Sequence, residues 1–170
     1  MEKYLSSVIK GGYLRNIKTI MKIKVNVEGL FYNNSLIKFN STRNDIIKHF
    51  GEPNSQDPVN GLPYFRYDDL GIGVFFNDNL LRSITVDYSY QQMNHSPKNC
   101  FCGTVEICGT IVNKDFNIDS FMSLITNNNL PHENCSIVGL DFSISYLEIK
   151  PHFYGKNESM SHLEIRIDEV

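Results

Sequence analysis

The sequence predicts an α+β fold in which two tandem ββαβββ-like repeats form an antiparallel sheet with the helices packed on one face. Two similar stretches indicate the duplication: KVNVEG at residues 24–29 and TVEICG at residues 104–109, which lie 80 positions apart. Each half also closes on a similar strand, SITVD at residues 83–87 and HLEIR at residues 162–166. Between these strands each half carries one helical pattern, so the order of the elements repeats.

The first repeat contains a hairpin, a helix and three further strands. Residues 23–27 alternate apolar and polar side chains, which predicts a strand with one buried face. A helix begins at Ser41 or Thr42, either of which can cap its first turn, and ends at Gly51 because Pro53 cannot continue it. After a polar loop, strands are predicted at residues 64–67, 72–76 and 81–88.

The second repeat follows the same order. A helix is predicted from about residue 118 to 126, with Asn117 or Asp119 as its cap. Apolar residues alternate from residue 140 to 146, which predicts one long strand. The remaining strands are predicted at residues 105–107, 110–112 and 163–167.

The chain divides into three segments: a basic N-terminal extension at residues 1–20, the first repeat at 21–90, and a linker with the second repeat at 91–170. One repeat alone buries little apolar surface, so we expect both repeats to form one continuous domain. Residues 1–20 are either a basic amphipathic arm or an extension upstream of a start at Met21.

The charge is unevenly distributed along the chain. Residues 1–24 carry a net charge of +5, and the other 146 residues carry −8. Phosphate binding needs a basic surface, so the acidic body argues against nucleic acid and favours a basic protein partner. No segment approaches the ~18 apolar residues that span a bilayer. The first 20 residues lack a continuous apolar region, so we expect a cytoplasmic protein with reduced cysteines.

The sequence offers one candidate metal cluster, formed by Cys100 and Cys102 with His95 and Cys108. Zinc sites usually space two cysteines by two to four residues, and a Cys-x-Cys pair is tighter than that. The thiols are therefore interpreted as buried or incidental, and we predict no metal and no cofactor.

Catalytic motifs are similarly weak. Cys135 could pair with His132 or His152 as a nucleophile and its base, but nothing around Cys135 resembles a nucleophile elbow or a helix N-terminus. The Gly71-Ile72-Gly73 stretch lacks the third glycine and the helix of a nucleotide-binding loop. We therefore predict that the protein is not an enzyme.

A binding surface is predicted on the strands of the first repeat, which are rich in aromatic residues with acidic neighbours. Phe75 and Phe76 are adjacent on a strand, so one of them must point away from the core. Exposed tyrosines are typical of protein interfaces; alternatively, these aromatics pack beneath the linker or the second repeat, and turn chemistry explains the aspartates. The predicted partner-binding residues are Tyr64, Tyr67, Asp68, Asp69, Phe76, Asp78, Tyr88 and Tyr90.

One part of the chain resembles a known group of proteins. The helix that ends in FGEP at residues 50–53 and the following YDDLGI at residues 67–72 resemble small bacterial immunity-type or uncharacterised domains, and the order of elements is similar to the tandem β-lactamase-inhibitor-protein-like and outer-membrane lipoprotein small-domain superfamily. The resemblance covers about residues 36–88. Exported members carry a signal peptide or a lipobox cysteine, and this sequence shows neither.

The resemblance implies a protein-binding module. The function that we predict is an intracellular immunity protein that binds and occludes a cognate antibacterial toxin. The toxin would be a protein, and the acidic body of this chain favours a basic one. The alternative is a structural or dimerising protein-interaction module of a larger assembly, which would use an exposed edge strand. Neither hypothesis involves nucleic acid or a membrane.

Overall fold

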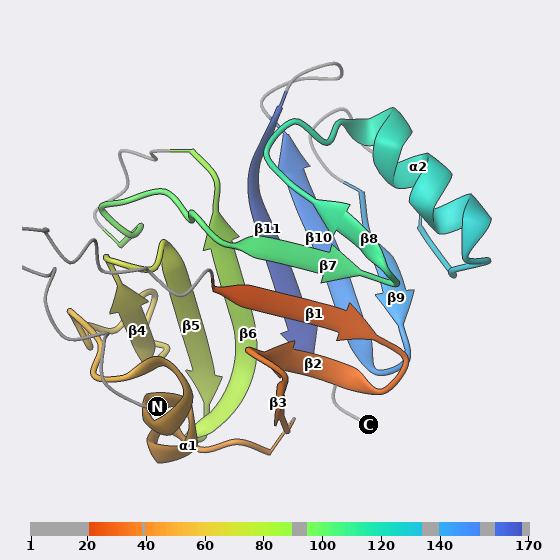
Figure 1. The fold of residues 1–170 in the computed structure, drawn as a ribbon. Helices are drawn as coiled ribbons and strands as arrows, with labels where there is room; N and C mark the ends of the chain where they lie inside the picture. Colours follow the sequence, from red (N-terminus) through yellow and green to blue (C-terminus); the bar gives the residue numbers. More distant parts are fainter. Residues whose placement is uncertain (1–20, 39, 90–94, 134–139, 154–158, 168–170) are drawn as a thin grey trace, which may run out of the picture.

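The computed structural model describes residues 21–38, 40–89, 95–133, 140–153 and 159–167. Within these ranges the chain forms two β-sheets and two α-helices (Figure 1), which confirms the predicted α+β class. The N-terminal extension at residues 1–20 lies outside the described residues. No helix in the described ranges is long and apolar enough to cross a bilayer.

The first sheet has five strands in the order β3-β2-β1-β7-β8. Its strands are β1 (Lys22–Asn26), β2 (Gly29–Tyr32), β3 (Ser35–Ile37), β7 (Thr104–Ile107) and β8 (Thr110–Val112). Strands β1 and β7 come from different repeats and run parallel, whereas the other neighbours are antiparallel. The sheet therefore joins the opening hairpins of the two repeats.

The second sheet has six strands in the order β4-β5-β6-β11-β10-β9, and all neighbours are antiparallel. Its strands are β4 (Tyr64–Tyr67), β5 (Ile72–Asn77), β6 (Leu80–Asp87), β9 (Phe142–Ile144), β10 (Leu147–Phe153) and β11 (Met160–Ile167). The closing strands β6 and β11 pair at the centre, so this sheet also contains strands from both repeats.

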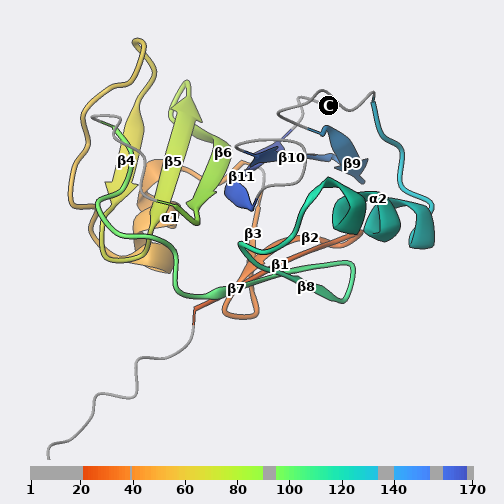
Figure 2. The same ribbon diagram turned by 90° about the horizontal axis from the view of Figure 1, so that it is seen from above.

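Two helices lie on the same side of the six-stranded sheet as the five-stranded sheet does (Figure 2). Helix α1 (Arg43–Phe50) begins with a capping box, in which Thr42 accepts from the Asp45 backbone and Asp45 accepts from the Thr42 backbone. Helix α2 (Ile118–Asn127) begins at Asn117, whose side chain accepts from the Ser120 backbone. Both helices lie where their sequence signals predicted them.

The prediction of a single antiparallel sheet was wrong in detail. The strands divide between two sheets, because each repeat contributes its opening hairpin to one sheet and its last three strands to the other. The predicted strand at residues 140–146 was also wrong, since Ser145 adopts a left-handed conformation with φ of 58° and separates β9 from β10. In the first repeat a third strand, β3, extends the opening hairpin.

The core fills the space between the two sheets. One cross-strand row of the six-stranded sheet, formed by Phe65, Val74, Ile84, Ile165 and Ile149, is buried throughout. Helix α2 is anchored by Phe121, whose ring lies 6.0 Å from the rings of Phe142 and Phe153, and helix α1 by Ile46. Burial of apolar side chains between the layers is the main stabilising contribution.

Two glycines allow a test of how tightly the loop at residues 100–101 packs on the sheet. Both Gly71 and Gly51 have positive φ, but a Cβ on Gly71 would lie 2.3 Å from the Phe101 backbone nitrogen, whereas the space at Gly51 is open. We expect Gly51→Ala to lower the free energy of unfolding by about 1 kcal/mol, from strain alone. Gly71→Ala should cost at least about twice as much, because backbone atoms must move. Urea denaturation of both variants checks this; equal losses would contradict it.

Candidate functional site

A polar face covers the side of the six-stranded sheet that points away from the five-stranded sheet (Figure 2). The strand registers place its residues in three cross-strand rows. From β4 towards β10, the rows are Tyr64, Phe75, Ser83, Arg166 and Glu148; Arg66, Gly73, Thr85, Glu164 and Lys150; and Asp87, His162 and His152. We call these residues the polar face. Because side chains alternate along a strand, the residues between them face the core.

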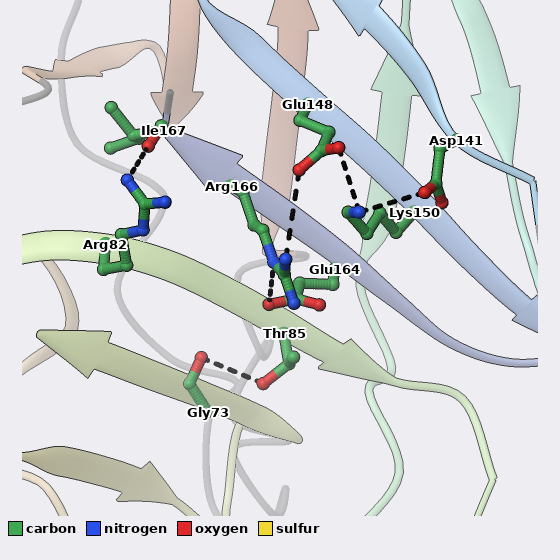
Figure 3. Close-up of polar contacts among 9 residues, drawn as sticks. All are labelled: Gly73, Arg82, Thr85, Asp141, Glu148, Lys150, Glu164, Arg166 and Ile167. Atoms are coloured by element: carbon green, nitrogen blue, oxygen red, sulfur yellow. Dashed lines mark hydrogen bonds and ion pairs between the residues drawn. The ribbon is translucent and has the colours of Figure 1, made fainter. Parts of the chain in front are cut away.

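Ion pairs connect one half of the polar face. The Lys150 Nζ atom lies 2.9 Å from Glu148 Oε1 and 3.0 Å from Asp141 Oδ2 (Figure 3). Arg166 Nε lies 2.8 Å from Glu164 Oε1, and its Nη1 lies 4.0 Å from Glu148 Oε2. Although burial lowers the pKa of Lys150, its contacts with Glu148 and Asp141 outweigh this effect and raise the pKa above its usual value. These charges therefore hold one another in place.

Tyr64 lies flat on the other half of the polar face. Its ring packs on Phe75 with ring centroids 4.5 Å apart, and its hydroxyl lies across Gly73, where a Cβ would be 2.3 Å from the Tyr64 oxygen. Burial, followed by the nearby Asp87 carboxylate, raises the pKa of the Tyr64 hydroxyl well above its usual value. The glycine is thus needed for the tyrosine to cover β5.

The third row brings two histidines and an aspartate together. The rings of His152 and His162 stack, with centroids 4.1 Å apart and planes 11° apart, and Asp87 pairs with His162 across β6 and β11. Burial and the neighbouring His152 lower the pKa of His162 to about 4, and burial raises the pKa of Asp87 to about 6. Burial also lowers the pKa of His152, so the uncharged form of both rings is favoured near neutral pH.

A cavity of about 350 Å³ opens beside the polar face, at the edge formed by β4. Tyr64 and Arg66 line it from the sheet, and His95 and Asp57 line it from the flanking loops. The Asp57 carboxylate accepts from the Ser55 hydroxyl at 2.5 Å. The cavity is polar and has the size of a small-ligand or side-chain pocket.

Two of the predicted partner-binding residues are not on a surface. Phe76 is fully buried and packs against Phe65 on the core side of the sheet, and Tyr67 is buried against Phe50 of α1. Placing them on a partner-facing surface was wrong: Phe76 shares its face with Val74, so Phe75 is the aromatic that points outward. A partner on the surface cannot touch either side chain without unfolding this part of the core.

Asp68 and Tyr88 have structural contacts. The buried Asp68 carboxylate lies 2.9 Å from Arg66 Nε and accepts from the Lys98 backbone N–H at 2.9 Å, so it ties the residue 95–99 segment to the sheet. Tyr88 is half-buried and packs edge-on against Phe101, with ring centroids 5.8 Å apart. Neither is freely available to a partner.

The other predicted binding residues divide into three cases. Tyr64 belongs to the polar face, although its side chain is largely buried there. Asp69 and Asp78 are exposed in the turns that follow β4 and β5, and Asp78 adopts a left-handed conformation with φ of 47°. Tyr90 lies outside the described residues. The structure therefore does not gather the predicted set into one patch.

The cysteines form no site in the described part of the chain. Cys100, Cys102 and Cys108 are free thiols, and no group of three or more potential metal ligands comes together among the described residues. Burial raises the pKa of the Cys108 thiol, which disfavours a reactive thiolate. Cys135 lies outside the described residues, so its predicted pairing with His132 or His152 is not tested.

The sequence contained a signal for the polar face that the prediction missed. Residues 148, 150 and 152 are Glu, Lys and His, and residues 162, 164 and 166 are His, Glu and Arg. Aligned antiparallel, the two strands pair Glu148 with Arg166 and Lys150 with Glu164. Cross-strand charge complementarity of this kind indicates neighbouring strands with a shared polar face.

The contacts of Asp68 predict a large effect on stability. We expect Asp68→Ala to lower the free energy of unfolding by roughly 2–4 kcal/mol, because it leaves Arg66 without its carboxylate partner and frees the loop at Lys98. The adjacent exposed variant Asp69→Ala should change stability by less than about 0.5 kcal/mol. Chemical denaturation of the pair provides the comparison, and a small effect at Asp68 would show that the contact does not stabilise the fold.

The opposite pKa shifts in the third row predict a specific pH dependence. Because the folded-state pKa of Asp87 is raised to about 6, its ionisation costs stability as the pH rises from about 4 to 6, whereas His162, with a folded-state pKa of about 4, adds stability over that interval. Asp87→Asn should therefore stabilise the protein at pH 7 by on the order of 1–3 kcal/mol, and not at pH 4. Unfolding curves from pH 4 to 7 measure this, with Asp69→Asn as the exposed control; a gain that does not depend on pH would contradict it.

Comparisons with known proteins define the family but not the activity. No curated protein matches the sequence. Among solved structures, the chain is similar to an extracellular protein containing an SCP domain from Bacillus anthracis, with 9% identity, 76% of this chain and 44% of that chain covered, and a TM-score of 0.50. The chain thus spans less than half of that protein, and the likeness concerns the fold alone.

A DUF4309 family protein from Bacillus subtilis is also similar, with 12% identity, 75% of this chain and 79% of that chain covered, and a TM-score of 0.42, which is too low to support an argument. The resemblance to β-lactamase-inhibitor-like and immunity-type domains stays a prediction. A family model described as a domain of unknown function, DUF7738, matches residues 22–122, from the start of β1 into α2. Since this match covers more than half of the 170 residues, the chain belongs to the DUF7738 family.

Proposed function

We propose that this protein is a protein-binding module that contacts its partner through the polar face of the six-stranded sheet. The observation that carries the proposal is the organisation of that face: three cross-strand rows of mainly polar side chains, on the side of the sheet where Figure 2 shows no helix or strand of the described chain. Solvated antiparallel sheet faces are ordinary. A face whose charges are paired and fixed is, in addition, already ordered for binding, so a partner pays little entropy to engage it.

The net negative charge of residues 25–170 favours a basic partner. The polar face itself carries three carboxylates, Asp87, Glu148 and Glu164, and three basic side chains, Arg66, Lys150 and Arg166. Beside it lie two further carboxylates, Asp68 and Asp141, and Lys98, whose Nζ is 3.8 Å from Asp68. Acidic side chains dominate residues 25–170 as a whole. Complementary fields increase the rate of encounter and suppress wrong partners. The partner that fits best is a protein with a basic active site or a basic rim.

The specific form of this proposal is an intracellular immunity protein that occludes a cognate antibacterial toxin. Its support is the sequence resemblance around residues 50–53 and 67–72 together with the net negative charge of residues 25–170. Occlusion needs no chemistry from the immunity protein, in keeping with our proposal that the chain is not an enzyme and acts without cofactor, nucleic acid or membrane. The proposed location is the cytoplasm, where such a toxin would be neutralised.

A second candidate is a structural or dimerising module of a larger assembly. The observation that favours it is the apolar character of a different surface, the outer face of the five-stranded sheet, where Leu36 and Ile111 are exposed. This candidate uses the opposite side of the molecule, so the two functions are compatible.

The proposed function is tested by neutralising two carboxylates of the polar-face region that a partner can reach. The double variant Asp141→Asn/Glu148→Gln is compared with Asp115→Asn/Asp119→Asn, which changes the net charge equally at exposed residues near α2. Each protein domain encoded beside this gene in the native host is tested as the partner. We expect the first double variant to bind roughly tenfold more weakly and the second to bind like the wild type.

Calorimetric titration measures the binding, and growth of cells that co-express toxin and protein measures the protection. Far-UV circular dichroism verifies that both double variants are folded. If no neighbouring toxin binds or is neutralised, the immunity function is wrong. If a toxin binds but both double variants lose affinity equally, the partner does not use the polar face.

A further inference from the structure

We infer that the outer face of the five-stranded sheet binds a second copy of this chain in a weak, twofold-symmetric dimer. This face points away from the six-stranded sheet (Figure 2), and the inference does not depend on the function proposed above. Four observations carry it: a row of side chains with apolar ends, the exposure of those ends, a Lys–Glu pair at the centre, and the symmetry that this order permits.

One row of side chains crosses all five strands of the outer face. The registers pair Leu36 with Phe31, Phe31 with Lys24, Lys24 with Glu106, and Glu106 with Ile111. The row is therefore apolar on β3 and β2, positive on β1, negative on β7, and apolar again on β8. The alternating burial of β1 and β7 confirms that the residues on either side of this row face the core.

The apolar ends of the row are open to solvent. Ile111 is 59% exposed and Leu36 is 41% exposed, and Val27, in the turn that joins β1 to β2, is 72% exposed. These are three of the five large hydrophobic side chains that are exposed in the described residues. Single exposed hydrophobics are ordinary, but several on or beside one sheet face mark an interaction surface.

The charged centre of the row is ionised and only partly paired within the chain. Lys22 Nζ lies 2.7 Å from Glu106 Oε2, whereas Lys24 Nζ lies 3.9 Å from Glu106 Oε1. The hydrogen bond from Lys22 holds the pKa of the Glu106 carboxyl below its usual value, so the group is a carboxylate. Among the described residues, this 3.9 Å contact is the only ion pair of Lys24. Its ammonium can therefore reach a carboxylate of a second copy without breaking a shorter ion pair there.

The order of the row selects one symmetric arrangement. A twofold axis that runs parallel to the strands, between β1 and β7, sets Lys24 against Glu106 of the second copy and Phe31 against Ile111 of the second copy. Each contact occurs twice, as in an isologous interface. Since β3 lies beyond β8 of the second copy in this arrangement, Leu36 is at the rim of the interface. An axis centred on β1 would instead set Lys24 against Lys24, so charge favours the first arrangement. Two sheets related in this way pack with nearly aligned strands, as sandwiches do.

The size of the face limits the strength of the dimer. Five strands spaced by ~4.8 Å give a face about 24 Å wide, and its strands have only three to five residues. The buried area falls towards the low end for specific interfaces. We therefore expect a dissociation constant in the micromolar range or above, and a dimer that weakens with added salt.

Reversing each charge separately gives a test that separates binding from folding. Lys24→Glu leaves only acidic groups at the two facing positions, and Glu106→Lys leaves only basic ones, so neither variant should self-associate. Mixed together, however, the two variants restore opposite charges across the interface and should form a heterodimer. Ile111→Ser should weaken the wild-type dimer by about tenfold.

Sedimentation velocity of the full chain, from about 5 to about 500 µM at low salt, measures association, and circular dichroism verifies folding. The polar-face variant Glu148→Gln is the matched control and should dimerise like the wild type. A wild-type protein that stays monomeric throughout overturns the inference. So does a mixture of the two charge-reversed variants that fails to associate, or a loss of the dimer in Glu148→Gln. None of these results bears on toxin binding, which is measured separately.

Discussion

The pairing of β6 with β11 determines both sides of the six-stranded sheet. Its register sets Ile84 opposite Ile165 in the core and Asp87 opposite His162 on the polar face. Because side chains alternate in a strand, a shift of one residue would turn the histidine inward and the isoleucines outward. Apolar burial, at roughly 25 cal/mol per Å², strongly favours the observed register. The burial of the core rows therefore also fixes the polar rows, which gain little stability from their own contacts.

This dependence explains why the polar face retains ionisable groups whose burial destabilises the folded protein. Asp87 is buried on the outer side of the sheet, its pKa is raised by that burial, and two neutral histidines stack beside it. Isolated groups of this kind would favour another arrangement. They are retained because the strands that carry them are held by the core beneath. Lys150 and Arg166, in contrast, lie among carboxylates that compensate part of their burial. The polar face thus combines two groups of side chains. The burial of Asp87, His162 and His152 costs stability, whereas Lys150 and Arg166 are compensated by the carboxylates around them.

The sequence was sufficient for the two helices and for most strands, and insufficient for the pairing of the strands. Capping residues such as Thr42 and Asn117 act locally, so both helices could be predicted. Alternation of period two shows which side chains of a strand are buried, but it does not show which strand lies alongside, and so β1 and β7, about 80 residues apart, were not expected to pair in parallel. The same limit affected the candidate site. Phe76 was placed on the surface although it alternates with Val74 and Ile72, and the complementary charges of β10 and β11 become visible only when the two strands are aligned antiparallel.

The duplication places two outer sheet faces on opposite sides of one core. Since each sheet takes strands from both repeats, neither repeat can detach without dividing both sheets, and the two outer faces are held on opposite sides of one core (Figure 2). A dimer formed through the five-stranded sheets would leave both polar faces uncovered and pointing away from each other. Such a dimer would present two equivalent binding surfaces, so a partner with more than one copy of its own site would be held more tightly than by a monomer. Association through one sheet would then strengthen recognition through the other without any change of conformation.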